Sequence, residues 1–273
     1  MKKLLVTDLG DTLYNWMGFF VPSFFAMVDE IVSITGLPKE QLLREYKEKH
    51  QYYKSVEFPY VSIKLPSVLA KYPGLQEDEL KALFRPAFNK FNAIRDENLK
   101  LFPGVAETLA AIRQSGVTIV GFTESSQENG FFRMLKLGIA EDFTHVYAFE
   151  SQFEGDFTLN PKIRIVTSKK PNPALLLTIC AEEGFSPAET LYMGDSLSKD
   201  VYMALNAGID CVWADYPEKY PEYAEMLLAV TSWLPEEYEA ETQRKAEMLE
   251  KGLVPNHVVH HYPELIDILR QYE

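Results

Sequence analysis

The sequence predicts an α/β protein in which helices lie on both faces of a Rossmann-like parallel sheet and a helical domain is inserted into that core. Three observations support this fold class. Residues 3–8 have the apolar pattern of a short buried strand. After residue 102, strand patterns alternate with helical ones, which is typical of a parallel sheet. Residues 16 to about 100 have helical patterns and few strand signals, which indicates a separate helical segment.

The inserted segment is expected to form a bundle of about four helices. Apolar residues recur at helical spacing from Phe24 to Val32, and Gly36 and Pro38 end this first pattern. Further helical patterns occur at 41–53, 66–72 and 77–94. The helical domain would therefore occupy residues 16–99.

The rest of the core is expected to alternate strands and helices along the chain. Strand patterns occur at 117–123, 145–149, 191–193, 211–214 and 257–260. Helical patterns occur at 105–114, from the end of the first of these strands to about 137, at 172–183, at 199–207 and at 263–269, with two more within 217–252. The core domain would comprise residues 1–15 and 100–273.

Composition and charge are those of an ordinary globular protein. The chain has 273 residues, of which 47% are hydrophobic and 25% charged. Its net charge is −13, and because binding of a phosphate backbone needs basic surface, we expect no nucleic-acid partner. Cys180 and Cys211 fit free core thiols in a reducing compartment. The apolar run after Lys3 is too short for a signal peptide, and no membrane span is expected, so a cytoplasmic protein is predicted. The oligomeric state is left open.

Polar side chains follow three of the predicted strands. The first strand ends at Asp8, a later one at Thr123, and another at Gly194-Asp195, with Asp200 five residues after Asp195. Lys170 precedes Pro171, where an intervening helix begins. In open α/β sheets, ligands bind beyond the carboxyl ends of the strands, so these groups could converge. Carboxylates can hold Mg²⁺, a lysine and a hydroxyl can hold phosphate oxygens, and a carboxylate can attack phosphorus.

These stretches resemble the four motifs of the haloacid dehalogenase-like (HAD) hydrolase superfamily. The segments, in order, are DLGDTL at 8–13, VGFTES at 120–125, KKPNPALL at 169–176 and GDSLSKD at 194–200. The stretch from Leu101 to Ser125 also resembles the usual approach to the second motif. The helical insertion between the first two motifs lies where many members carry a helical cap. The resemblance implies a phosphatase-type enzyme that acts on a small phosphorylated metabolite and uses Mg²⁺.

The resemblance also implies roles for single residues. Asp8 would be the nucleophile and a metal ligand, with Asp195, Asp200 and the backbone carbonyl of Gly10 completing the metal site. Thr123 and Glu124 would bind the phosphoryl group, together with nearby backbone amides. Lys170 would neutralise the charge of the nucleophile and the phosphate. Lys169 is the alternative for this role, and the Lys-Pro-Asn-Pro pattern favours Lys170.

The first motif departs from the family pattern at two neighbouring positions. The family has an acid/base aspartate two residues after the nucleophile, where this chain has Gly10. The next position, usually glycine, is Asp11. A shift of one residue re-aims a side chain, so Asp11 is a candidate either for catalysis or for capping the turn. Proton transfer to the leaving group, worth about 10²–10⁴-fold, is the step that this departure affects.

Three functions follow from these observations. The leading one is a Mg²⁺-dependent phosphatase that works through an aspartyl-phosphate. A halide-removing hydrolase of the same superfamily also lacks the second aspartate but needs no metal, and the pair Asp195 and Asp200 argues against it. A weakly active or non-catalytic phosphate-binding protein is the third, and Gly10 is its support.

Overall fold

The computed structural model describes residues 1–150 and 160–273, which form two compact units. The core unit contains Met1–Asn15, Lys100–Glu218 and Ala240–Glu273, and the helical unit contains Trp16–Leu99 and Lys219–Glu239. The chain therefore passes between the units four times. The sequence-based division had placed residues 219–239 with the core, whereas their contacts group them with the helical unit.

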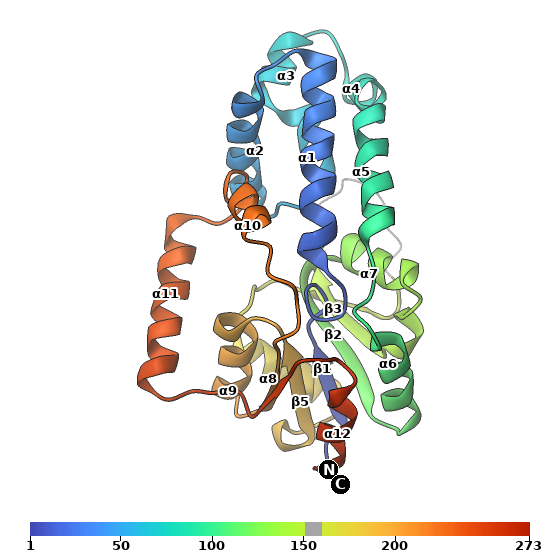
Figure 1. Cartoon of the computed structure of the whole chain (residues 1–273), viewed down its shortest axis with the longest axis vertical. Coiled ribbons are helices and arrows are strands. Elements are labelled where there is room, and N and C mark those ends of the chain that lie inside the picture. Colours follow the sequence, from blue (N-terminus) through green and yellow to red (C-terminus); the bar gives the residue numbers. More distant parts are fainter. Residues whose placement is uncertain (151–159) are drawn as a thin grey trace. The chain divides into compact units, whose positions relative to one another are not determined.

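The core unit is built on a seven-stranded parallel sheet, in which the strand order is β4-β3-β2-β1-β5-β6-β7 (Figure 1). The strands are β1 (Leu4–Thr7), β2 (Thr118–Ser126), β3 (His145–Phe149), β4 (Ile163–Val166), β5 (Thr190–Gly194), β6 (Asp210–Ala214) and β7 (His257–Val259). This confirms the predicted parallel α/β sheet. The sequence pattern does not predict β4, and β2 extends three residues beyond Thr123, where the predicted strand ends.

Helices cover both faces of the sheet. In β1, Leu4 and Val6 point to one face, where they join a core cluster with Leu176 of α8 (Pro173–Glu182), Met203 of α9 (Tyr202–Asn206) and Met248 of α11 (Pro235–Glu250). On the other side, α6 (Val105–Gln114) packs on β2, α12 (Glu264–Arg270) packs on β7, and the two helices touch each other. The helix α7 (Gln127–Lys136) follows β2 directly. Burial of alternate side chains on two faces explains why the strands are almost wholly apolar.

The position of β1 determines where a ligand can bind. Consecutive strands run outward from β1 through β2 and β3 to β4, and the later strands run outward on its other side, starting with β5. The strand order therefore reverses between β1 and β5. Ligands of open α/β sheets bind at this switch point, beyond the carboxyl ends of the strands. The residues after Thr7 and after Gly194 occupy that place.

The helical unit contains five α-helices between residues 16 and 99. They are α1 (Trp16–Thr35), α2 (Lys39–Tyr53), α3 (Pro66–Lys71), α4 (Glu77–Leu83) and α5 (Arg85–Asn98), with a 3₁₀ turn at Pro59–Lys64. The pattern at 77–94, predicted as one helix, is divided into α4 and α5. Pro86 lies at the start of α5, and a proline fits the first turn of a helix but not its interior.

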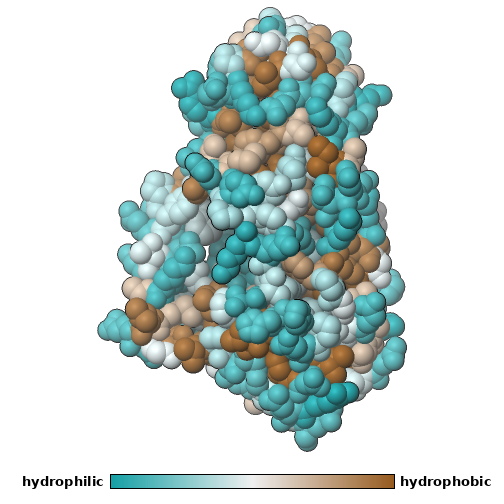
Figure 2. All heavy atoms as spheres, in the orientation of Figure 1, coloured by the Kyte–Doolittle hydropathy of each residue, from teal (hydrophilic) through white to brown (hydrophobic). Residues whose placement is uncertain are grey.

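The helix α1 is long and apolar enough to span a membrane by length and composition alone. Half of that apolar window is buried inside the structure. The helix packs along α5, and Phe20 stacks between Trp16 and Phe24 with ring centroids at 4.7 and 5.8 Å. A core helix of a folded bundle has the same composition, so the packing accounts for its apolar character. On the face in Figure 2, hydrophilic residues predominate, with smaller hydrophobic areas between them.

The segment 219–239 joins the helical unit through α2. It contains α10 (Pro221–Leu228) and the first residues of α11. Nδ1 of His50 donates to the carbonyl of Val230 at 2.6 Å, and the amide of Gln51 donates to the carbonyl of Trp233 at 2.9 Å. Both donors lie near the end of α2, so two neighbouring side chains hold the loop between α10 and α11.

Candidate active site

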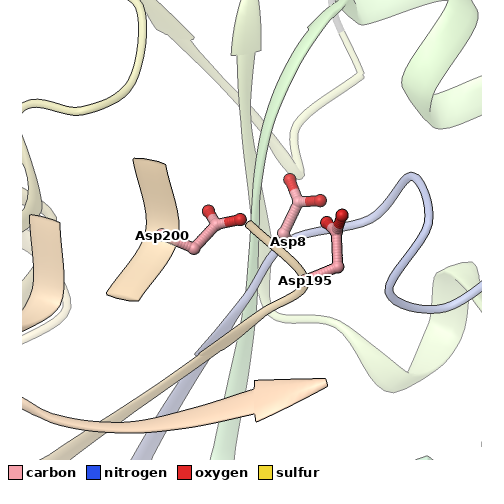
Figure 3. A group of neighbouring side chains, drawn as sticks. All are labelled: Asp8, Asp195 and Asp200. Atoms are coloured by element: carbon pink, nitrogen blue, oxygen red, sulfur yellow. The ribbon is translucent and has the colours of Figure 1, made fainter. Parts of the chain in front are cut away.

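Three carboxylates converge beyond the ends of β1 and β5. Asp8 follows β1, Asp195 follows β5, and Asp200 lies in a π-helical turn over Leu197–Val201. Each can offer one oxygen so that all three atoms lie within 4.8 Å of one another. Figure 3 shows the carboxylates of Asp8 and Asp195 side by side, with that of Asp200 pointing toward Asp8. The sequence-predicted residues from the first and last motifs therefore come together in the structure.

Asp200 is held rigidly by groups around it. Its Oδ1 accepts a hydrogen bond from the hydroxyl of Tyr192 at 2.6 Å, and its Oδ2 accepts one from the backbone N–H of Ser196 at 3.1 Å. Gly194 makes room for it, because a Cβ at this position would lie 2.4 Å from Cγ of Asp200. The glycine at the end of β5 is thus a packing requirement for the acidic cluster.

Lys170 contacts one carboxylate from the first motif and one from the last motif. Its Nζ donates to Oδ1 of Asp8 at 2.5 Å and to Oδ1 of Asp200 at 2.9 Å. It also lies over the rings of Phe122 and Tyr192, at 5.0 and 5.8 Å from the centroids. Only 7% of Lys170 is exposed. Of the two neighbouring lysines, it is Lys170 that makes these contacts with Asp8 and Asp200.

Burial and charge shift the ionisation of the cluster. Burial raises the pKa of Asp8, and the charge of Asp200 adds to this, while the charge of Lys170 opposes it. Burial also raises the pKa of Asp195 well above its ordinary value, and the charges of Asp200, Asp8 and Asp11 act in the same direction. Burial alone would lower the pKa of Lys170, but the charges of Asp200 and Asp8 raise it well above its ordinary value. The site contains more negative charge than one ammonium can compensate.

The turn after Asp8 takes a conformation that suits glycine. Asp11 has a φ of +54°, in the left-handed region that side-chain-bearing residues other than Asn and Asp rarely adopt. Its N–H donates to the carbonyl of Tyr14 at 2.8 Å. The backbone therefore keeps a left-handed residue at the position that is glycine in the family, although the glycine of this chain lies one residue earlier, at Gly10. Among the described residues, the three-carboxylate cluster does not include Asp11.

Thr12, which the sequence analysis did not single out, lies between the two carboxylates. It is fully buried, and its hydroxyl is 3.4 Å from Oδ2 of Asp8 and 3.4 Å from Oδ1 of Asp195. Its side chain is the first polar group after the turn at Asp11. The sequence shows a threonine in the first motif but not the direction in which a left-handed turn aims it.

Two aromatic side chains donate hydrogen bonds to backbone carbonyls in the loops of the site. Trp213 lies in β6, and Tyr216 follows that strand. The indole N–H of Trp213 donates to the carbonyl of Asp195 at 2.8 Å. The hydroxyl of Tyr216 donates to the carbonyl of Thr12 at 2.5 Å. Both residues were missed from the sequence, because side-chain bonds to a distant main-chain carbonyl leave no pattern. Only the position of Trp213 and Tyr216 near the carboxyl end of β6, on the side of the sheet where the site lies, could have indicated them.

Thr123 and Glu124, predicted to bind phosphate, lie near the end of β2. Thr123 is buried, and its hydroxyl oxygen accepts a hydrogen bond from the N–H of Ser125 at 3.1 Å, which leaves the hydroxyl hydrogen able to donate. The carboxylate of Glu124 accepts from the backbone N–H of Lys170 at 3.1 Å and from Nζ of Lys199 at 2.6 Å. The two residues thus present different chemistry: a hydroxyl donor and an acceptor already engaged by two donors.

The acidic cluster fits a hard divalent cation. Mg²⁺ prefers carboxylate and carbonyl oxygens and keeps several waters, and the carboxylates of Asp8, Asp195 and Asp200 supply three such oxygens close together. Burial raises the pKa of Asp8 and Asp195, and a bound cation would favour the charged form of both carboxylates. The carbonyl of Gly10 as a further ligand stays a prediction.

A parallel sheet with carboxylates and a buried ammonium at its switch point defines a class of α/β enzymes that carry out their chemistry with acidic side chains beyond the strand ends. Residues 26–214 match the haloacid dehalogenase-like hydrolase family. Since this match covers more than half of the chain, the protein belongs to that family, and the resemblance drawn from the four motifs is confirmed. The match begins at residue 26, so Asp8 and Gly10 lie outside it.

Two of the curated relatives that the chain resembles are phosphatases. The chain is 29% identical over 207 residues to a phosphoglycolate phosphatase of Vibrio vulnificus, which covers 76% of this chain and 80% of that protein. It is 25% identical over 213 residues to a glyceraldehyde 3-phosphate phosphatase of Methanopyrus kandleri, which covers 77% of this chain and 82% of that protein. The protein is therefore a phosphatase-type member of the family.

Solved structures share the fold over the whole chain. A 2-haloacid dehalogenase from Pseudomonas syringae pv. Tomato matches with a TM-score of 0.60 and 22% identity, covering 100% of both chains. A HAD phosphatase from Thermococcus onnurineus matches with a TM-score of 0.57 and 19% identity, covering 98% of both. At these identities the likeness shows the common α/β fold alone.

Proposed function

We propose that the protein is a Mg²⁺-dependent phosphatase that removes phosphate from a small phosphorylated metabolite through an aspartyl-phosphate on Asp8. The observation that carries this proposal is the placement of Lys170, whose Nζ contacts both Asp8 and Asp200 beside the carboxylate of Asp195. A buried ammonium and a cation-binding cluster around one carboxylate are what attack on an anionic phosphate requires.

The chemistry has two displacements at phosphorus. In the first, a carboxylate oxygen of Asp8 forms a bond to phosphorus while the bond from phosphorus to the substrate oxygen breaks, and the departing oxygen takes a proton. In the second, water attacks the same phosphorus, gives up a proton, and releases inorganic phosphate and the free carboxylate. A bound Mg²⁺ would offset negative charge on the phosphoryl oxygens. Lys170 would do the same from the protein side and hold Asp8 in place.

Phosphate would be bound at the end of β2. The hydroxyl of Thr123 retains a hydrogen that it can donate, because its oxygen accepts rather than donates in the bond with Ser125. The N-terminus of α7 follows at Gln127, where the backbone N–H groups of a first helical turn favour anions. The proton for the leaving oxygen has no donor at Gly10, and Asp11 is the nearest acidic candidate in the chain.

The helical unit would serve as the cap that its insertion between the first two motifs implies, and would exclude water and select the substrate. The named substrates of the relatives, phosphoglycolate and glyceraldehyde 3-phosphate, are the first compounds to test. Both compounds are small phosphate esters.

A panel of phosphate esters and 2-haloacids, assayed with Mg²⁺ and with excess chelator, tests the proposal. Release of phosphate that stops on chelation supports it. Halide release that persists in chelator would replace it with the metal-independent dehalogenase. Binding of inorganic phosphate without turnover of any ester would replace it with a phosphate-binding protein that has kept the pocket.

A further inference from the structure

We infer that the carboxylate of Glu124 is a positioning group that fixes Lys170 and the Asp200 turn relative to β2, rather than a ligand of the phosphate. The inference rests on the proposed phosphatase function and assigns Glu124 a role within it. Glu124 lies near the end of β2, one residue after Thr123. Its two carboxylate oxygens contact the loop after β4 and the turn after β5. One side chain therefore connects the ends of three strands, β2, β4 and β5.

The first contact fixes the backbone from which Lys170 extends. Oε1 of Glu124 accepts a hydrogen bond from the backbone N–H of Lys170 at 3.1 Å. A lysine ammonium sits at the end of a flexible four-carbon chain, so the position of its Nζ depends on where the main chain is held. In this site Nζ must reach Asp8 and Asp200 together, at 2.5 and 2.9 Å. An error of about 1 Å in such a placement can lower a rate about 100-fold.

The second contact fixes the turn that carries Asp200. Oε2 of Glu124 accepts from Nζ of Lys199 at 2.6 Å, and the side chains are 27% and 22% exposed. Lys199 directly precedes Asp200 within the π-helical turn Leu197–Val201. The ion pair therefore ties this turn to the end of β2, while the hydrogen bond ties the loop after β4 to the same point.

The charge of Glu124 argues against a direct role in phosphate binding. A carboxylate within the phosphate site would repel the anion. In the structure the carboxylate is paired with Lys199, which gives the pair no net charge, and both of its oxygens already accept a hydrogen bond. These contacts orient the carboxylate of Glu124 toward the neighbouring loops. The hydroxyl of the adjacent Thr123 is the group that can donate a hydrogen bond to an anion.

The test compares Glu124→Ala, Glu124→Gln, Lys199→Met and the Glu124→Ala/Lys199→Met double variant. Glu124→Gln keeps an oxygen that can accept from the N–H of Lys170, and Lys199→Met removes the ion pair while leaving the carboxylate of Glu124 in place. Glu247→Gln is the matched control, since it removes an ion pair of the same length, 2.6 Å, to Lys251 after α11. The assays are kcat and KM for the best phosphate ester, melting temperature, and hydrogen exchange at the amide of Lys170.

We expect Glu124→Ala to lower kcat about 10- to 100-fold, as loss of a supporting group in a site typically does, with little change in KM. Glu124→Gln should recover part of kcat and the slow amide exchange, and Glu247→Gln should stay within about twofold of wild type. The double variant should lose less than the product of the single losses, because both variants remove the same ion pair.

A kcat for Glu124→Ala within about twofold of wild type would overturn the inference. An increase of about tenfold or more in the Michaelis constant, with kcat unchanged, would also overturn it, since that change is typical of lost substrate binding. Should Glu124→Ala fail to fold, the same criteria apply to Glu124→Gln and Lys199→Met. If the wild-type protein hydrolyses no ester, the proposed function fails, and exchange at Lys170 that is fast in Glu124→Ala but slow in Glu124→Gln still supports the positioning contact.

Discussion

Lys170 donates to Asp8 at 2.5 Å and to Asp200 at 2.9 Å, so a single buried ammonium holds together two carboxylates that are 192 residues apart in the chain. The side chain of Lys170 is only 3% exposed. A buried ion of either sign is stable only when it is paired. Lys170 therefore has a structural role in addition to the catalytic one proposed for it.

Replacement of Lys170 by methionine should destabilise the folded protein. The variant would leave the buried carboxylates of Asp8 and Asp200 without their cation, and removal of one partner from a buried pair costs about 3–5 kcal/mol. We expect the free energy of unfolding, measured in denaturant at pH 8, to fall by about this amount, and added Mg²⁺ to restore part of it. An unchanged unfolding midpoint would show that the pair contributes nothing to stability.

Asp8→Asn should abolish turnover and leave the fold intact. An amide cannot form the acyl-phosphate, whereas its size and its place at the end of β1 match those of the carboxylate. Phosphate release and the circular dichroism spectrum measure the two effects. Acid-quenched wild type should contain phosphate on Asp8, and the variant should contain none. Substantial activity in Asp8→Asn would mean that another group attacks phosphorus.

Asp195→Asn should weaken Mg²⁺ binding by at least about tenfold, because it removes one of three carboxylates that lie within 4.8 Å of one another. Titration calorimetry with Mg²⁺ alone measures this without reference to activity. The control is Asp215→Asn, at a carboxylate that lies outside the acidic cluster. Equal affinity in wild type and Asp195→Asn would place the metal elsewhere.

The residues at positions 10 and 11 predict that the rate of hydrolysis depends strongly on the leaving group of the phosphate ester. Without a general acid at position 10, the departing oxygen carries its charge unaided, so aryl and acyl phosphates should react far faster than alkyl phosphates. Gly10→Asp combined with Asp11→Gly should narrow this gap, because glycine suits the φ of +54° at position 11. The rates of an aryl and an alkyl ester, compared in each variant, give the measurement.

Asp11→Ala distinguishes the two roles left open for Asp11. If the change alone abolishes turnover while the fold and Mg²⁺ binding persist, Asp11 supplies the proton. The glycine at position 10 would then not mean that the enzyme has lost its general acid. If turnover persists, Asp11 serves the turn. Alanine at a φ of +54° is strained, so the melting temperature of the variant has to be compared with that of Asp11→Gly.

His50 should make stability depend on pH. Burial lowers its pKa from 6.5 to about 4, although the bond to the carbonyl of Val230 opposes this. Among the described residues, the buried Nε2 has no hydrogen-bond partner, so a second proton on the ring would have no acceptor. Between these pH values the unfolded chain binds more protons than the folded one, so the free energy of unfolding falls as the pH is lowered from about 6.5 to about 4. The difference of about 2.5 between the two pKa values corresponds to roughly 3 kcal/mol in the free energy of unfolding.

Denaturant unfolding of wild type and His50→Asn across this range isolates the effect. Asparagine keeps a neutral N–H donor near the position of Nδ1 but does not titrate. The carboxylates of the acidic cluster titrate equally in both proteins, so the difference between the two curves belongs to His50. Parallel curves between pH 4 and 6.5 would contradict the shift.

The sequence was sufficient to predict the parallel sheet and to indicate that carboxylates from separate strand ends lie close together. Asp8, Thr123 and Asp195 directly follow or end apolar runs, and such runs report strands whatever their tertiary surroundings. The strand β4 was not predicted because Ile163–Val166 has four residues with a charged Arg164 inside it, as an edge strand allows. Its identity as a strand comes from its pairing with β3, which is a tertiary property.

The groups that orient the site residues could not be predicted in the same way. Thr12, Trp213 and Tyr216 act through hydrogen bonds to residues or carbonyls far away in the chain. Such bonds depend on where two loops meet, and no spacing in one segment encodes that. The same reason explains why residues 219–239 were placed with the core, since their contacts with His50 and Gln51 join segments 180 or more residues apart.

The four passages of the chain between the units limit how the protein can be remodelled. A helical unit formed by one continuous insertion could be replaced by substituting the single segment between Asn15 and Lys100. Here, that exchange would leave Lys219–Glu239 without the surface formed by His50 and Gln51. Replacement of the whole helical unit must therefore alter two separate stretches of the gene together, one of them more than a hundred residues downstream of the other.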